Sequence, residues 1–209
     1  LAKGRIDDAW DAVNAVDKER PGWLPFEWEQ TRLDVLEALG RADEAQAFRW
    51  ACFELTLTAE HLRQHLKRLP DFDDVEAEER ALSLAVHYPE IHQALHFLIG
   101  WPAIDHAADL VLGRSQELDG NHYGVLGPAA EALEGKHPLA ATLALRAMID
   151  FSLGKARTTR YRHAARHLMQ CASLANTIAD YGQFEPHDSY VDRLRSKHGR
   201  KSSFWPLVG

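Results

Sequence analysis

The feature that most constrains the fold is a six-residue pattern that occurs twice, 36 residues apart. It reads GRIDDA from Gly4 to Ala9 and GRADEA from Gly40 to Ala45. A period in the thirties is typical of stacked helical hairpins, because one hairpin is too small to bury its own apolar face. In each copy we expect the Gly to follow one helix with a positive φ and the Asp to open the next. The Ala lets the two helices approach closely.

The spacing of small residues repeats further along the chain. Cys52 follows Ala45 by seven residues, and a looser third copy after Gly154 places Cys171 seven residues past Ala164. This pattern resembles a tetratricopeptide repeat in the second helix of each hairpin, whereas residues 29–39 lack the Trp and Gly-Tyr positions of the family's first helix. The resemblance implies antiparallel helical hairpins stacked as a tetratricopeptide-like α-solenoid. The alternative is a generic helical hairpin with a Gly cap.

Helical periodicity extends over the whole chain, and no stretch alternates as a strand would, so we predict an all-α fold. Pro138 to Leu153 is nearly apolar all round and is expected to be buried, and 160–181 is the longest helix candidate. Glycines are frequent between 113 and 127, where we expect the loosest part of the chain. We therefore predict one helical-repeat domain, 1–209, with a possible subdivision into 1–112 and 129–209.

The composition indicates a folded protein of a reducing compartment. Hydrophobic residues make up 45% and charged residues 26% of the 209 residues, and no run is long enough for a membrane helix. Cys52 and Cys171 lie on apolar helix faces, where we expect small buried residues rather than a disulfide. We expect a cytoplasmic location. Because the chain begins at Leu1 without a Met or a signal peptide, we expect the C-terminal part of a longer protein.

A second resemblance covers nearly the whole chain. The chain is similar to a bacterial family of uncharacterised helical proteins in four runs: LPDFDD at 69–74, HPLAAT at 137–142, RYRHAARH at 160–167 and HGRKSSFW at 198–205. Membership implies a longer parent protein with further helices before Leu1. It implies no established activity and therefore no catalytic residue.

Charge is distributed unevenly. Residues 1–149 hold 14 Lys and Arg against 26 Asp and Glu, whereas residues 150–209 hold 10 against 5. If the two basic helices of this segment are neighbours, their cations could line a groove for an acidic peptide or a phosphate backbone. These same cations could instead pair with acids of the preceding repeats or complement a helix C-terminus. The candidate binding residues are Arg157, Arg160, Arg162, Arg166, Arg193, Arg195, Lys197, Arg200 and Lys201.

The sequence contains no complete metal-binding or catalytic motif. Three His pairs lie four residues apart, His61/His65, His92/His96 and His163/His167, but each lacks the Glu of a His-Glu-x-x-His zinc motif. The acidic run 71–79 lacks the alternation and central Gly of a calcium loop. The chain carries no Gly-x-Ser-x-Gly, phosphate-loop or dinucleotide motif. We therefore assign no catalytic residue, no metal ligand and no cofactor.

These observations favour a non-catalytic interaction scaffold that binds a protein or peptide in a helical-repeat groove. The alternative is a nucleic-acid-binding helical module that uses the basic C-terminal segment. The two hypotheses separate by salt, because phosphate binding weakens steeply as salt rises. We expect no membrane partner, and the sequence assigns neither the ligand nor the oligomeric state.

Overall fold

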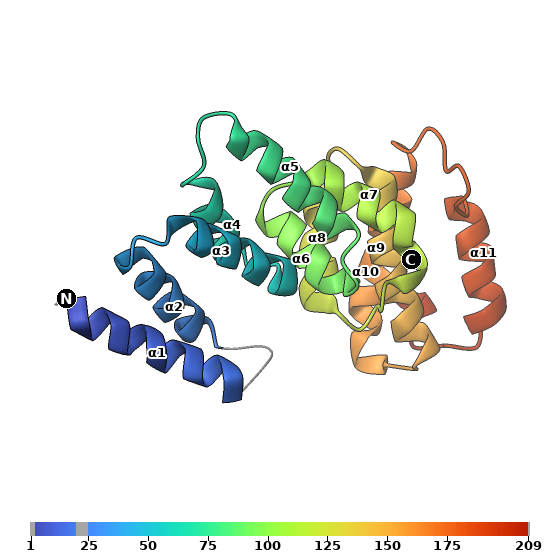
Figure 1. The fold of residues 1–209 in the computed structure, drawn as a ribbon. Helices are drawn as coiled ribbons and strands as arrows, with labels where there is room; N and C mark the ends of the chain where they lie inside the picture. Colours follow the sequence, from blue (N-terminus) through green and yellow to red (C-terminus); the bar gives the residue numbers. More distant parts are fainter. Residues whose placement is uncertain (1–2, 20–24, 209) are drawn as a thin grey trace. The chain divides into compact units, whose positions relative to one another are not determined.

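The computed structural model describes residues 3–19 and 25–208, and these form eleven α-helices and three 3₁₀-helices without a strand (Figure 1). The all-α prediction is confirmed. The chain forms two compact units, Leu1–Ala81 and Leu82–Gly209, with the boundary inside the fifth helix. Among the described helices, none has both the length and the apolar character needed to cross a bilayer.

The first unit consists of helices that pack in chain order, α1 on α2, α2 on α3 and α3 on α4. Its core joins Leu33 and Leu36 of α2 to Ala45 of α3, with Trp10 and Phe48 packed against them. The fully buried Ala45 lets α2 and α3 approach, as the repeat predicted. The helices are α1 (Lys3–Glu19), α2 (Phe26–Ala38), α3 (Ala42–Thr56), α4 (Ala59–Leu66) and α5 (Asp73–Val86), the last of which continues into the second unit.

The two copies of the repeat differ at their glycines. Gly40 has a φ of 71° between α2 and α3, which confirms the predicted left-handed turn. Gly4 was predicted to precede a helix, and this was wrong: α1 already begins at Lys3. In the third copy, Gly154 ends α9, but the left-handed residue is Ala156, with a φ of 49°.

In the second unit, contacts join both consecutive and alternate helices. α6 packs on α7 and α8 on α9, while α6 also contacts α8 and α7 contacts α9. α10 packs along α9, which has ten buried residues, so its predicted burial is confirmed. The elements are α6 (Ile91–Gly100), α7 (Ile104–Arg114), η1 (Ser115–Glu117), α8 (Tyr123–Leu133), α9 (Pro138–Gly154), η2 (Thr158–Arg160), α10 (Tyr161–Ala175), α11 (His187–His198) and η3 (Trp205–Leu207).

Two helix predictions in this unit were wrong. The Gly-rich segment is largely helical, because α8 continues through Gly124 and Pro128. Pro128 cannot donate the usual hydrogen bond to Gly124, but the buried apolar face of α8 offsets this loss. α10 ends at Ala175 instead of continuing to residue 181, and the Thr177 hydroxyl donates to the Leu174 carbonyl at 2.8 Å. Such a side-chain bond competes with helix continuation.

Candidate functional site

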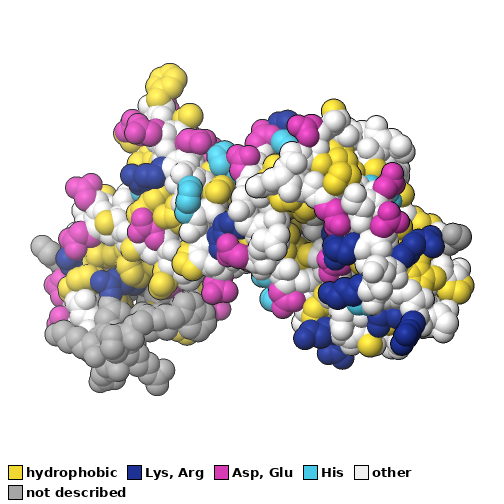
Figure 2. Space-filling model, turned by 90° about the vertical axis from the view of Figure 1, so that its right-hand side faces the viewer, with side chains coloured by type: hydrophobic (Ala, Val, Ile, Leu, Met, Phe, Trp, Pro, Cys, Tyr) yellow, Lys and Arg dark blue, Asp and Glu magenta, His cyan; other side chains and the backbone are white. Residues whose placement is uncertain are grey.

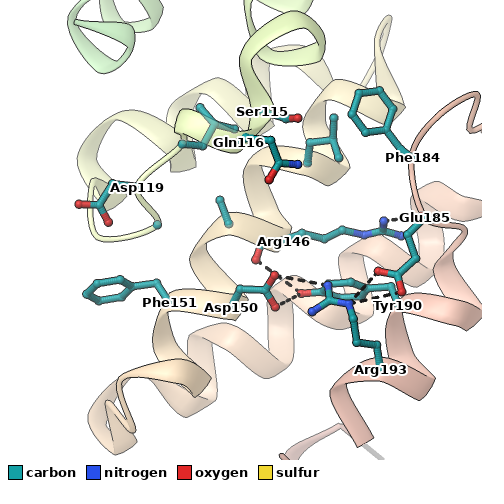
Figure 3. A pocket seen from close by; sticks show the side chains of 14 residues that line it. Ser115, Gln116, Asp119, Arg146, Asp150, Phe151, Phe184, Glu185, Tyr190 and Arg193 are labelled. Carbon is teal, nitrogen blue, oxygen red and sulfur yellow. Dashed lines mark hydrogen bonds and ion pairs between the residues drawn. The ribbon is translucent and has the colours of Figure 1, made fainter. Parts of the chain in front are cut away.

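The strongest candidate site is a cavity of about 420 Å³ in the second unit (Figure 3). Its walls come from three places: the η1 segment with the turn that follows it, one face of α9, and the start of α11 with the two residues before Pro186. The lining is rich in polar and charged side chains, among them Ser115, Gln116, Asp119, Arg146, Asp150, Glu185 and Arg193.

Helical spacing explains how α9 supplies one wall. Leu143, Arg146, Ala147, Asp150 and Phe151 recur at intervals of three, one, three and one residues, which places them on the same face of a helix. The rest of α9 is mostly buried and apolar. α9 therefore holds a cation and a carboxylate one turn apart at the edge of an apolar core.

A glycine brings the opposite wall close to α9. A Cβ added to Gly120 would lie 1.9 Å from the carbonyl oxygen of Ala147, closer than any side chain tolerates. Gly120 therefore allows the turn after η1 to rest directly on the α9 backbone. The same turn carries Asp119, whose side chain is exposed and lines the cavity.

Arg146 is the unusual residue of this cavity. Its side chain is only 6% exposed, and its Nη1 donates to the backbone oxygen of Glu185 at 2.6 Å. The guanidinium lies over the ring of Tyr190, 4.4 Å from the ring centroid, and 5.8 Å from the centroid of Tyr181. Its Nε and Nη2 atoms have no hydrogen-bond partner among the described residues. A buried cation thus retains two unused donors, an arrangement that costs free energy.

Three other charged groups of the cavity, Asp150, Glu185 and Arg193, are paired through Arg193, as the dashed lines of Figure 3 show. Arg193 Nε donates to Glu185 at 3.0 Å, and its Nη2 lies 3.5 Å from Asp150. The Tyr190 hydroxyl donates to Asp150 at 3.2 Å. Burial, and then the charge of Asp150, raise the pKa of Tyr190 well above its usual value, so this hydroxyl remains a proton donor. Arg193 is consequently neutralised.

The two unused donors of Arg146 match one kind of ligand, which reaches them once the guanidinium turns toward the cavity, because both nitrogens expose almost no surface. Nε and Nη2 point to the same side of a guanidinium, where they can hold both oxygens of a carboxylate or phosphate in parallel hydrogen bonds. In Figure 3 the Arg146 side chain extends along the cavity toward the segment of Phe184 and Glu185. Acidic side chains line the same cavity, which disfavours a ligand with many negative charges.

The predicted basic residues fall into separate groups. Arg193 lines the cavity, and Arg195 and Lys201 lie over the rings of Trp205 and Tyr161 at 4.9 and 5.7 Å. Figure 2 shows Lys and Arg side chains gathered over one part of the face it presents. Among the nine predicted residues, those that are exposed and whose side chains make no ion pair, hydrogen bond or ring contact within the described chain are Arg157, Arg162, Lys197 and Arg200.

Arg160 and Arg166, two further residues of the predicted cluster, contact groups other than carboxylates. Arg160 donates to the Asn121 side-chain oxygen at 3.0 Å and lies 4.5 Å from the centroid of Tyr123. Arg166 donates to His163 Nδ1 at 2.9 Å. These contacts fix the two side chains on the surface of the second unit.

The histidine pairs are not brought together as metal-binding pairs. His92 stacks on His122 with ring centroids 4.0 Å apart, and its Nε2 accepts from the Asp119 backbone at 3.1 Å. His167 packs near Tyr123 while its pair member His163 is exposed. His61 and His65 are both buried in α4, but His61 hydrogen-bonds Glu29 instead.

Sequence reasoning missed Arg146 as a functional candidate. It stands between Leu145 and Met148 in a helix read only as apolar and buried. A single charge inside such a run is itself a signal, because a buried arginine needs a partner.

Comparison with known proteins places the chain in a family. No curated protein and no solved structure matches it. A family model matches residues 1–207, nearly the whole chain. The chain therefore belongs to the family described as "Family of unknown function (DUF6880)".

Proposed function

We propose that this protein is a non-catalytic interaction scaffold that binds a carboxylate-bearing peptide segment of a partner protein in the Arg146 cavity. The observation that carries the proposal is the pair of unpartnered donors on a buried guanidinium that lines a cavity. An acidic side chain or a C-terminal carboxylate would complete these hydrogen bonds and neutralise the charge.

The contacts between helices support the proposal that the protein is a scaffold of stacked helical hairpins. Contacts between alternate helices, α6 with α8 and α7 with α9, are those expected when the hairpins α6/α7 and α8/α9 stack on each other. We propose that this arrangement is tetratricopeptide-like. In such a stack, loops and helix faces of successive hairpins line a common binding surface, as η1, α9 and α11 line the cavity.

Nucleic acid remains the alternative ligand, which the exposed cations at 157, 162, 197 and 200 would bind. The cavity favours peptide for two reasons. Arg146 is too buried to reach the outer backbone of a duplex, and the acids that line the cavity would repel a chain of phosphates.

The test is a selection of random displayed peptides against the whole chain, followed by calorimetric titration of a selected peptide. We expect the peptide to carry an acidic residue or free C-terminus, and its amide analogue to bind at least about 10-fold more weakly. Arg146→Lys keeps the charge but loses the two-donor fork, and should weaken binding similarly.

Two control variants distinguish binding in the cavity from binding to the exposed cations. Arg162→Gln should leave peptide affinity unchanged, whereas Gln116→Trp, at an exposed position on the cavity wall, should block binding. Peptide affinity that does not respond to Arg146→Lys or Gln116→Trp would contradict the proposal. Binding of RNA or DNA that weakens steeply with salt and is lost in Arg162→Gln would favour the alternative.

A further inference from the structure

A second group of polar side chains is buried in the first unit, far in sequence from the Arg146 cavity. It consists of Glu29 of α2, Cys52 of α3 and His61 of α4, which are 6%, 5% and 0% exposed. Three consecutive helices each contribute one side chain. Their carboxylate oxygen, sulfur and ring nitrogen all lie within 4.8 Å of one another.

The donor set matches one class of ligand. Thiolate, imidazole and carboxylate are the three side-chain donors that Zn²⁺ uses in proteins, with bonds of about 2.0–2.3 Å in a tetrahedral arrangement. Tetrahedral bonds of that length separate ligand atoms by about 3.2–3.8 Å. His61 Nε2 and Glu29 Oε2 are 2.8 Å apart and no pair of the three atoms is more than 4.8 Å apart, so shifts of about an ångström bring them to tetrahedral spacing.

The charges of the three groups point the same way. A thiolate and a carboxylate together balance the two positive charges of Zn²⁺, so the occupied cluster would carry no net charge. His61 is fully buried, and its Nδ1 has no hydrogen-bond partner among the described residues. Arg32 is the cation that acts electrostatically on Cys52, and its guanidinium lies over the ring of Phe48, 4.8 Å from the ring centroid.

The other buried cysteine provides an internal comparison. Cys171 occupies the corresponding repeat position on α10 and is also fully buried. Its sulfur lies 4.0 Å from the backbone oxygen of Thr142, and Cys171 belongs to no His, Cys, Asp and Glu group of the described residues that could hold a metal ion. The Cys52 cluster is therefore not a general consequence of the repeat.

We propose that Glu29, Cys52 and His61 bind a Zn²⁺ ion in the first unit. The three protein ligands leave one tetrahedral position for water. Binding requires the Cys52 thiol to lose its proton to solvent, so that the sulfur electron pair bonds the metal. No redox change is involved, and the site is independent of peptide binding at Arg146.

The test uses the full chain, first dialysed against a chelator and then titrated with CoCl₂ and ZnCl₂ alone. Co²⁺ takes the same tetrahedral sites and reports a bound thiolate by charge-transfer absorption. We expect this absorption to saturate at one equivalent and to disappear when Zn²⁺ displaces Co²⁺. Zn²⁺ should also raise the melting temperature, since a ligand that binds the folded chain stabilises it.

Matched variants locate the site. Cys52→Ser should remove the charge-transfer band and weaken Zn²⁺ binding at least about 100-fold. Loss of a residue that only hydrogen-bonds a metal ligand costs about 10- to 100-fold, and loss of the ligand itself should cost more. Cys171→Ser removes an equally buried thiol and should bind as the wild type does. Glu29→Gln keeps the side-chain shape and should weaken binding with the fold retained, as checked by circular dichroism.

The wild-type titration decides the matter even if Cys52→Ser fails to fold. Absence of a thiolate band at one equivalent of Co²⁺ would overturn the proposal. So would a band that is lost in Cys171→Ser and retained in Cys52→Ser.

Discussion

At the scale of single residues, the two arginines of the cavity contrast in their partners. Arg193 is exposed and bonded to two carboxylates, whereas Arg146 is buried and bonded to one carbonyl. Exposed ion pairs contribute little to stability, and a buried cation without a counter-ion is unfavourable. We therefore expect Arg146 to contribute little to the stability of the fold.

The variant Arg146→Met tests how much Arg146 contributes to the stability of the fold. The thioether fills much of the space of the arginine stem. The change loses one charged hydrogen bond and the cation–π contacts with Tyr190 and Tyr181, and it removes a buried charge. We expect the free energy of unfolding to change by less than about 1 kcal/mol, because these two effects oppose each other. Chemical denaturation would measure the change. A loss of more than about 3 kcal/mol would instead assign Arg146 a structural role.

The second prediction concerns how the stability of the protein depends on pH through His167. Burial, followed by the nearby cations of Arg166 and His163, lowers the pKa of His167 from 6.5 to about 4. Between these values the unfolded chain binds a proton that the folded chain does not, so stability falls as the pH drops from about 6.5 to 4. Above pH 7 both states are neutral at this group, and it adds no pH dependence.

The measurement is denaturant unfolding at a series of pH values for the wild type and His167→Gln. We expect the variant to lose less stability on acidification, by on the order of 1 kcal/mol at pH 5. His96→Gln, at an exposed position on α6, is the matched control for the loss of a histidine. Parallel curves for the wild type and His167→Gln would show that His167 titrates alike in both states.

At the scale of elements, local sequence signals predicted most helices but not the site. Apolar periodicity and the turn at Gly40 located helices to within a few residues. The prediction from local signals was wrong for α8. Its Pro128 is tolerated inside the helix because α8 buries its apolar face against the rest of the unit. Arg146 was visible as a single charge in an apolar helix, but its unused donors depend on contacts with α11 and the segment before it. The Glu29 cluster was missed because its three residues meet only when α2, α3 and α4 pack together.

Gly120 provides a prediction at this scale. Gly120→Ala should destabilise the second unit by more than about 2 kcal/mol, because the added Cβ would meet the α9 backbone and force the turn away. The matched control is Gly113→Ala inside α7, where a Cβ meets nothing within 4 Å. That change should be neutral or stabilise by up to about 1 kcal/mol through helix propensity. Equal thermal shifts for both variants would contradict the close approach.

At the scale of the whole molecule, the two candidate sites belong to different units. The Glu29 cluster lies in Leu1–Ala81, and the Arg146 cavity lies in Leu82–Gly209. A ligand stabilises the cooperative structure that must open to release it. If each unit opens separately, each ligand should protect the amides of its own unit.

Hydrogen exchange with residue resolution tests this expectation. At about 100 times its dissociation constant, Zn²⁺ should slow exchange in α2, α3 and α4 by up to about 100-fold, corresponding to about 2.7 kcal/mol. A selected acidic peptide should slow exchange in α9 and α11 and leave α2 to α4 unchanged. Protection of both units by either ligand would show that they open together, so that binding at one site stabilises the other. Protection of α9 by Zn²⁺ without protection of α2 to α4 would contradict the assignment of the metal to Glu29, Cys52 and His61.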